Sequence, residues 1–173
     1  WEIDQQNNIR LQQKQLQKVF GAVPSKTSLV ETDFDTTDVR DALLNSGYSF
    51  DMKTFFIAEG VTQYLTEAGI DSICKSLSGA KTGSMFVFTY VLRDFLEGNA
   101  FYGWEKGYEK YVLKDKLWLS GKNPEEWPPY LKQYGWQVKE DIGAKELETW
   151  YTAPAGRNYG LLEVERIVLA EKL

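Results

Sequence analysis

Three carboxylates stand directly after short apolar runs, at the points where three predicted strands end. Asp4 follows "WEI", Asp33 follows "SLVET" and Glu59 follows "FFIA". In open α/β sheets, ligands bind beyond the carboxyl ends of parallel strands, where such side chains gather. One acid there can accept hydrogen bonds from ribose hydroxyls, a second from an adenine amino group, and a third can meet an ammonium group. Together they favour a positively charged nucleoside over a nucleotide polyphosphate, whose anions three carboxylates would repel.

Each of these acids also has a structural interpretation. Acidic residues at strand ends often cap the following helix or face water. Taken alone, each carboxylate fits that interpretation better than a binding role. Three at successive strand ends favour a shared site, although their spacing does not name the ligand.

The elements that must position these acids alternate between apolar strands and helical patterns. Strands are predicted at residues 1–4, 27–34, 53–60, 83–91, 136–143 and 161–173, and helices at 7–21, 38–48, 66–79 and 123–135. Thr66 is the expected N-cap of the third helix, and Thr37 or Asp38 of the second. Nearly continuous apolar strands between helices predict an α/β fold with a mostly parallel sheet covered on both faces. The last two strands alternate like edge strands and are expected to pair antiparallel.

One domain over residues 1–173 is the economical interpretation, with a helical, lid-like insertion at about 93–122. In this insertion Phe101, Trp104, Tyr108 and Tyr111 recur at spacings of three and four, which predicts an aromatic stripe on one helical face. The first interpretation is that the rings pack in the hydrophobic core, as such stripes usually do. Because the segment follows a strand end, a cover over a substrate, with Trp104 in contact, is the second interpretation.

The composition excludes several classes of function. The chain has 173 residues, a formal charge of −5, no histidine and one cysteine. A Ser-His-Asp triad and a histidine-ligated zinc are therefore absent from it, and no metal is expected. The negative charge argues against nucleic acid and anionic membrane as partners, and no apolar run approaches the roughly 20 residues that span a bilayer. Cys74, predicted to fill core, suits a reducing, cytoplasmic compartment.

The motifs "EIDQQ", "ETDFD", "FFIAEGVTQYL" and "MFVFTYV" resemble the leucine carboxyl methyltransferase family, and the likeness continues through "WLSGKNPEEWPPYLKQYGWQVKEDIG" to "VERIVLAEKL". The resemblance implies a Rossmann-like class I methyltransferase fold that uses S-adenosyl-L-methionine as cofactor. It places Asp4 on the cofactor ribose, Asp33 and Phe34 at the adenine, and Glu59 beside the methionine portion.

The sequence departs from that family at its start. The family's first strand, its glycine-rich turn and an upstream basic residue that contacts the cofactor carboxylate are not among these residues. We therefore expect a C-terminal portion of a methyltransferase domain, with an exposed sheet edge where the first strand belongs. Activity is predicted to need the N-terminal segment, or a partner chain that completes the sheet.

In such an enzyme the methyl group is already activated, so the protein mainly aligns the acceptor and excludes water. A carboxylate acceptor needs no base. An alcohol or phenol could need one, and Glu59, Tyr64 and Tyr90 are the candidates. Tyr90 is placed at the end of the 83–91 strand, where it is either a substrate contact or a core or rim aromatic. Arg93 or Arg157 could hold an anionic substrate, or could be a surface or structural charge.

The sequence thus predicts an S-adenosylmethionine-dependent O-methyltransferase acting on a carboxylate or hydroxyl of a small molecule, or on a protein C-terminal carboxylate. The alternative is a non-catalytic or split module of the same fold that binds nucleosides or serves in assembly.

Overall fold

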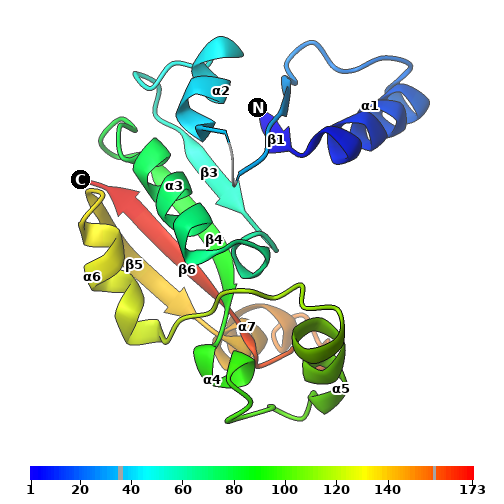
Figure 1. Ribbon diagram of the computed structural model, residues 1–173, viewed down its shortest axis with the longest axis vertical. Helices are drawn as coiled ribbons and strands as arrows, with labels where there is room; N and C mark the ends of the chain where they lie inside the picture. Colours follow the sequence, from blue (N-terminus) through cyan, green and yellow to red (C-terminus); the bar gives the residue numbers. More distant parts are fainter. Residues whose placement is uncertain (35–36, 158) are drawn as a thin grey trace.

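The strands of the computed structural model form two separate sheets (Figure 1). The model describes residues 1–34, 37–157 and 159–173. The smaller sheet pairs β1 (Glu2–Asp4) with β2 (Leu29–Glu31) in parallel. The larger sheet has the order β3-β4-β6-β5, and its strands are β3 (Phe55–Ala58), β4 (Met85–Val91), β5 (Trp136–Ile142) and β6 (Glu165–Lys172). The α/β fold and its mixed sheet agree with the sequence prediction.

Helices connect most of these strands. They are α1 (Gln6–Phe20), α2 (Val39–Asn45), α3 (Glu67–Leu77), α4 (Arg93–Leu96), α5 (Glu105–Gly107), α6 (Trp127–Lys132) and α7 (Ala144–Leu147). Short 3₁₀ turns occupy Thr62–Tyr64 and Pro124–Glu126, and π-helical turns occupy Tyr108–Lys114 and Glu148–Thr152. In the part of the chain that the structure describes, no helix combines the length and the apolar character that crossing a bilayer requires.

Local sequence signals account for the helix boundaries. The hydroxyl of Thr66 accepts a hydrogen bond from the Gly69 amide at 3.1 Å, so Thr66 caps α3 as predicted. Of the two candidates for α2, Asp38 is the cap, because its carboxylate accepts from the Arg40 amide at 2.8 Å. Gly21 ends α1 with a φ of 79°, a left-handed conformation that glycine adopts without steric cost.

The core lies between one face of the larger sheet and the helices α3 and α6. Alternate residues of β4, Phe86, Phe88 and Tyr90, are buried on this face, as the period of two in a strand requires. Phe88 and Tyr90 meet the ring of Trp127 in α6 at centroid distances of 4.6 and 5.3 Å. Cys74 of α3 is also buried, and burial is the main cause that raises the pKa of its thiol to about 12. The prediction of Cys74 as core filling is confirmed.

Two details of the sheet differ from the sequence prediction. The C-terminal strand β6 is antiparallel, as expected, but it lies inside the sheet between β4 and β5, and β5 forms the edge. The reason is burial: Val168 and Ala170 of β6 are completely buried, which an edge position would not give. The second face is open at β3, where the side chains of Phe55 and Ile57 are 58% and 67% exposed. The expected cover on both faces is therefore wrong at this strand.

The segment after β4 leaves the sheet and returns to nearly the same point. It departs after Val91, and a parallel bridge joins Leu92 to Lys122, whose amide donates to the Val91 carbonyl at 3.2 Å. Between these ends the rings gather around Phe95, which is fully buried: Trp104 stacks on it at 5.9 Å, and Tyr111 stacks on Trp118 at 5.1 Å. The aromatic residues thus form a core of the segment itself.

A groove of about 460 Å³ runs between the two sheets. Its walls come from β1 and β3 and from the helices α2 and α3, and include Ile3, Leu43, Phe56, Ile57 and Leu77. In the described residues, β1 pairs with β2 alone and β3 pairs with β4 alone, so each has one edge without a strand partner. The groove is therefore apolar and bordered by two strands with unpaired edges.

Candidate functional site

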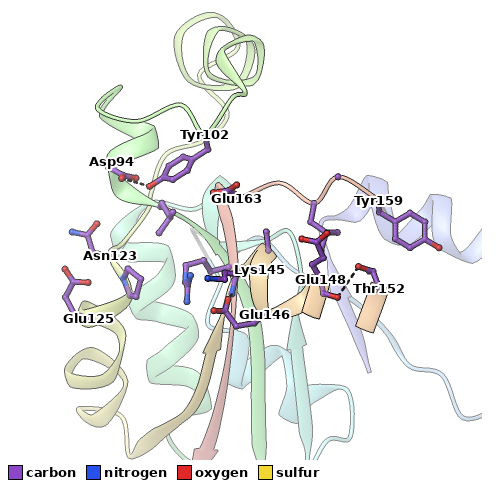
Figure 2. Close-up of a pocket in the computed structure, with 17 residues that line it drawn as sticks. Asp94, Tyr102, Asn123, Glu125, Lys145, Glu146, Glu148, Thr152, Tyr159 and Glu163 are labelled. Carbon is purple, nitrogen blue, oxygen red and sulfur yellow. Dashed lines mark hydrogen bonds between the residues drawn. The ribbon is translucent and has the colours of Figure 1, made fainter. Parts of the chain in front are cut away.

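A large cavity opens at one end of the larger sheet (Figure 2). Because β6 runs antiparallel, its first residues pair with the last residues of its neighbours: Glu165 with Val91, and Ile167 with Ile142. The loops after β4 and β5 and the loop before β6 must therefore meet. They enclose a volume of about 820 Å³, which is ample for a small-molecule ligand.

One wall of the cavity is built from Asp94 in α4 and Tyr102. The Tyr102 hydroxyl donates to Asp94 Oδ2 at 2.6 Å, and Figure 2 shows the Glu163 carboxylate beside the same ring. Burial, the hydrogen bond to Asp94 and the charges of both acids raise the pKa of Tyr102 to about 12. Tyr102 has a φ of 52°, which is uncommon for a residue with a side chain and is found preferentially at functional sites.

Arg166, which also lines the cavity, forms an ion pair with Asp141. Arg166 Nε donates to Asp141 Oδ1 at 2.7 Å and its Nη2 to the Asp141 carbonyl at 3.1 Å, while the Tyr90 hydroxyl donates to Asp141 Oδ2 at 2.8 Å. The guanidinium lines the cavity. Both oxygens of Asp141 are thus used, and the positive charge of Arg166 is largely offset by its partner.

The turn after β5 leaves room for that guanidinium. A Cβ atom at Gly143 would lie 2.7 Å from Arg166 Nη1, so any larger residue would displace the arginine. The Gly143 amide donates to Glu146 Oε2 at 2.9 Å, and this bond is the main cause that lowers the pKa of Glu146. Glu146, which lines the cavity, is therefore held as a carboxylate.

The cavity lining is predominantly acidic. Its carboxylates outnumber its cations by five to two: Asp94, Glu125, Glu146, Glu148 and Glu163 against Lys145 and Arg166. The polar side chains Tyr102, Asn123, Thr152 and Tyr159 complete the polar lining. Among the described residues, no group of three or more acids, cysteines and histidines is arranged to hold a metal ion.

The predicted cofactor residues Asp4 and Asp33 lie at the same end of the smaller sheet. The Asp4 carbonyl accepts from the Thr32 amide at 2.9 Å, which fixes the chain just before Asp33. The Asp4 carboxylate accepts from the Gln5 amide and the Asn8 side chain at 2.7 and 2.9 Å, both through Oδ1. A hollow of about 400 Å³ adjoins these strand ends, lined by Gln5, Gln6, Asn7, Glu31, Thr32 and Asp33.

The other two predicted cofactor residues lie elsewhere. Phe34 lines the groove between the sheets. Glu59 is exposed just after β3, ahead of Gly60, whose φ of 66° turns the chain and whose amide donates to Thr89 Oγ1 at 2.8 Å. Asp35, the last residue of the quoted "ETDFD" motif, lies outside the described residues. The roles of Asp4, Asp33, Phe34 and Glu59 stay predictions.

The predicted acceptor residues are mostly engaged within the fold. Tyr90 is 1% exposed, and burial together with its bond to Asp141 raises its pKa, which disfavours a role as a base. Arg93 forms an ion pair with Glu126 at 2.7 Å. Trp104 lies in the aromatic cluster with Phe95 and Trp118. Tyr64 is exposed in the Thr62–Tyr64 turn. These placements describe the residues and leave their roles as predictions.

Sequence reasoning missed the cavity wall formed by Asp94, Tyr102 and Glu163. A signal was available in the pattern of the last two strands. If they pair antiparallel within the sheet, the residues before the final strand fall beside the residues that follow the 83–91 strand. Glu163 and Asp94 occupy those two positions.

Comparisons with known proteins agree with this architecture. Residues 1–78 match the sequence model of the leucine carboxyl methyltransferase family. No curated protein sequence matches the chain. A DUF574 family protein from Streptomyces avermitilis has a similar structure, with a TM-score of 0.68 and 11% identity over 99% of this chain and 64% of its own. The mitomycin 7-O-methyltransferase MmcR has a TM-score of 0.61 and 12% identity over 99% of this chain and 41% of its own.

A third solved structure contains ligands. It is NcsB1, an O-methyltransferase from neocarzinostatin biosynthesis in complex with S-adenosylmethionine and 2-hydroxy-5-methyl naphthoic acid; its TM-score is 0.55, with 11% identity over 99% of this chain and 40% of its own. The chain thus spans between 40% and 64% of the length of these three proteins. Over residues 1–78 the chain carries the sequence pattern of the leucine carboxyl methyltransferase family, and its described residues have the Rossmann-like fold of class I methyltransferases.

Proposed function

We propose that this protein is an S-adenosylmethionine-dependent methyltransferase that transfers a methyl group to an oxygen of a small molecule. The observation that carries the proposal is the cavity of about 820 Å³ at the carboxyl ends of β4 and β5, where α/β sheets bind ligands. The family match over residues 1–78 and the methyltransferase fold support the same conclusion.

The cofactor is proposed to bind at the ends of β1 and β2. The hollow beside Asp33 is lined by carboxylate and amide oxygens, which are hydrogen-bond acceptors and suit ribose hydroxyls, an adenine amino group and an ammonium group as donors. Among the described residues, the two hydrogen bonds of the Asp4 carboxylate both use Oδ1, so Oδ2 is proposed to make such a contact. Phe34 and Glu59 are proposed to contact the adenine and the methionine portion. S-adenosylmethionine, when bound, supplies a methyl group on a positively charged sulfur.

The chain's own residues have to orient the acceptor and exclude water. The cavity walls after β4 and before β6 approach each other at Asp94, Tyr102 and Glu163, and this arrangement can fix a polar acceptor. A hydroxyl acceptor loses a proton during transfer, and a carboxylate of this wall can accept it. The proposal assigns no role in this step to Tyr90, since its hydroxyl is buried and donates to Asp141.

A further strand is proposed to complete the sheet. The groove between β1 and β3 is apolar, both bordering edges lack a strand partner in the described residues, and Phe55 and Ile57 are exposed beside it. An extended apolar segment, from the same protein or a partner chain, would satisfy both edges. Without this strand the proposed cofactor site would be incomplete.

A cytoplasmic location is also proposed for the protein, and its single, buried cysteine supports this location.

The cofactor proposal is tested by titration calorimetry of the protein with S-adenosylmethionine. Asp33→Ala should weaken binding about tenfold, the order of magnitude for one lost charged hydrogen bond. Asp51→Ala is the control, since Asp51 is also exposed and lies outside the hollow. Equal affinities for the two variants would refute the placement of the cofactor.

The alternative function is a non-catalytic module that binds a nucleoside or serves in assembly. The two unpaired strand edges favour it, because such edges recruit other chains. Binding of S-adenosylmethionine without methyl transfer to any compound of a metabolite panel would support this alternative. Absence of both binding and transfer, with the completing segment present, would exclude the methyltransferase and the nucleoside-binding module.

A further inference from the structure

The turn after β3 combines an unattached side chain with a backbone that is held from two sides. Glu59 is exposed, and within the described ranges its carboxylate makes no hydrogen bond or ion pair. The residues that follow it are buried: Thr62, Gln63 and Leu65 are 6%, 4% and 6% exposed. Because a turn normally runs over the surface, the buried backbone groups of this one need partners from other parts of the chain.

Strand β4 supplies the first of these partners through Thr89, which is 8% exposed. The Gly60 amide donates to Thr89 Oγ1 at 2.8 Å, and the Thr62 hydroxyl donates to the Thr89 carbonyl at 2.7 Å. The Gly60 N–H belongs to the planar peptide unit that also contains the Cα atom of Glu59. The bond to Thr89 Oγ1 therefore fixes the direction in which the backbone leaves Glu59.

The segment that follows β4 supplies the other partners, at the point where it returns to the sheet. The Leu119 amide donates to the Gln63 carbonyl at 2.6 Å. The Ser120 hydroxyl, on a residue 5% exposed, lies 2.5 Å from the Leu65 carbonyl oxygen and 3.0 Å from that of Thr62, so its single proton is shared between them. The turn is thus held between β4 and this returning segment.

We propose that Thr89 is a positioning residue for Glu59: its hydroxyl orients the peptide between Glu59 and Gly60 so that the carboxylate is ready to meet the methionine portion of S-adenosylmethionine. This inference rests on the proposed function, in which Glu59 makes that contact. With the backbone already fixed, only the rotamers of the Glu59 side chain have to be ordered on binding, which lowers the entropic cost. Ser120 supports the same turn from its other side.

A double-mutant cycle tests whether Thr89 acts through Glu59. The affinity for S-adenosylmethionine is measured by titration calorimetry of the protein with the completing segment present. Thr89→Val keeps the shape of the side chain and removes its hydroxyl; it should weaken binding about fivefold, but less than about twofold when Glu59→Gln is already in place. Thr89→Ser keeps the hydroxyl and should restore most of the affinity. Equal losses with and without Glu59→Gln would overturn the inference.

Ser84→Ala is the matched control. Ser84 is 1% exposed, and its hydroxyl accepts from the Thr54 amide at 3.1 Å, which is the same kind of bond at the opposite end of the β3 and β4 pair. Its loss should lower the midpoint of urea denaturation, as Thr89→Val does, and leave the affinity for the cofactor unchanged. An equal loss of affinity in Ser84→Ala and Thr89→Val would mean that Thr89 has a structural role alone.

Hydrogen exchange measured without cofactor gives a readout that is independent of binding. Thr89→Val should raise the exchange of the 60–65 amides about tenfold, whereas Ser84→Ala should leave these amides at their wild-type rates. Ser120→Ala is the second variant, for the case that Thr89→Val does not fold, and the same changes in exchange and affinity are expected of it. Unchanged exchange of the 60–65 amides in both Thr89→Val and Ser120→Ala would refute the positioning role.

Failure of this inference is distinguishable from failure of the proposed function. Absence of S-adenosylmethionine binding by the wild-type protein would contradict the function and the inference with it. Binding that Glu59→Gln weakens and Thr89→Val does not would support the function and refute the role of Thr89. Binding that is insensitive to Glu59→Gln would likewise refute the inference, while leaving the cofactor site at Asp33 to its own test.

Discussion

The two sheets of this protein differ in how many side chains they bury and in how many strand partners they have. The larger sheet buries Tyr90, Trp127 and Trp136 to 1% exposure or less, and every strand in it except the two at its edges has partners on both sides. The smaller sheet has two strands of three residues, and the α1 helix beside it buries a single side chain, Ile9. The proposed cofactor residues Asp4 and Asp33 follow the strands of the smaller, less buried sheet, whereas the cavity lies at the end of the larger, well-buried sheet. Regions that bind ligands are commonly drawn from the less stable parts of a fold.

The largest expected effect lies in the core of the larger sheet. Trp127→Ala removes a ring that contacts Phe88 and Tyr90, and should lower the free energy of unfolding by about 3–5 kcal/mol. The measurement is urea denaturation followed by circular dichroism. Trp150→Ala is the matched control, since Trp150 is 50% exposed, and it should change stability by less than about 0.5 kcal/mol. A small effect of Trp127→Ala would show that α6 does not hold this core.

A smaller and local effect is expected in the smaller sheet. Ile9 is 4% exposed, and Ile9→Ala should raise hydrogen exchange of the α1 and β1 amides by about tenfold or more, because it loosens this region alone. The β4 amides should keep their wild-type rates, as read by mass spectrometry. Leu11→Ala, at a position 59% exposed on the same helix, is the control. Faster exchange in β4 as well would mean that the two sheets open as one unit.

The smallest effect concerns the pH dependence of stability in the core between the larger sheet and α3, where Cys74 is the titrating group. Its thiol has a pKa of about 12 in the fold and 9.0 as a free side chain, so the folded protein holds this proton more tightly. The resulting stabilisation is complete below pH 9 and declines as the pH rises toward 12. At pH 8 a thiol reagent should react only as fast as the protein unfolds. Immediate reaction in the native state would contradict the burial of Cys74.

Local signals in the sequence predicted the parts of the fold that depend on neighbouring residues. Thr66 caps α3, and Asp38 resolves the choice of cap for α2, because each bonds an amide two or three residues away. The position of β6 inside the sheet could not be read in this way. It follows from pairing with β4 and β5, which are distant in the sequence.

The same reason explains why the sequence singled out strand-end acids and missed the acidic cavity. Asp4, Asp33 and Glu59 stand beside apolar runs, and that position is visible in the sequence. Asp94, Tyr102 and Glu163 come together only through the register between β4 and β6. Arg93 was chosen as a possible anion ligand, and its ion pair with Glu126 depends on a contact 33 residues away.

The bridge between Leu92 and Lys122 gives the intervening segment entry and exit points side by side on the sheet. Loops with adjacent ends can be lengthened, shortened or exchanged at little entropic cost, and this one has an aromatic core of its own. Because the segment contributes Asp94 and Tyr102 to the cavity, its residues can change the lining of the cavity while the strands of the larger sheet stay constant.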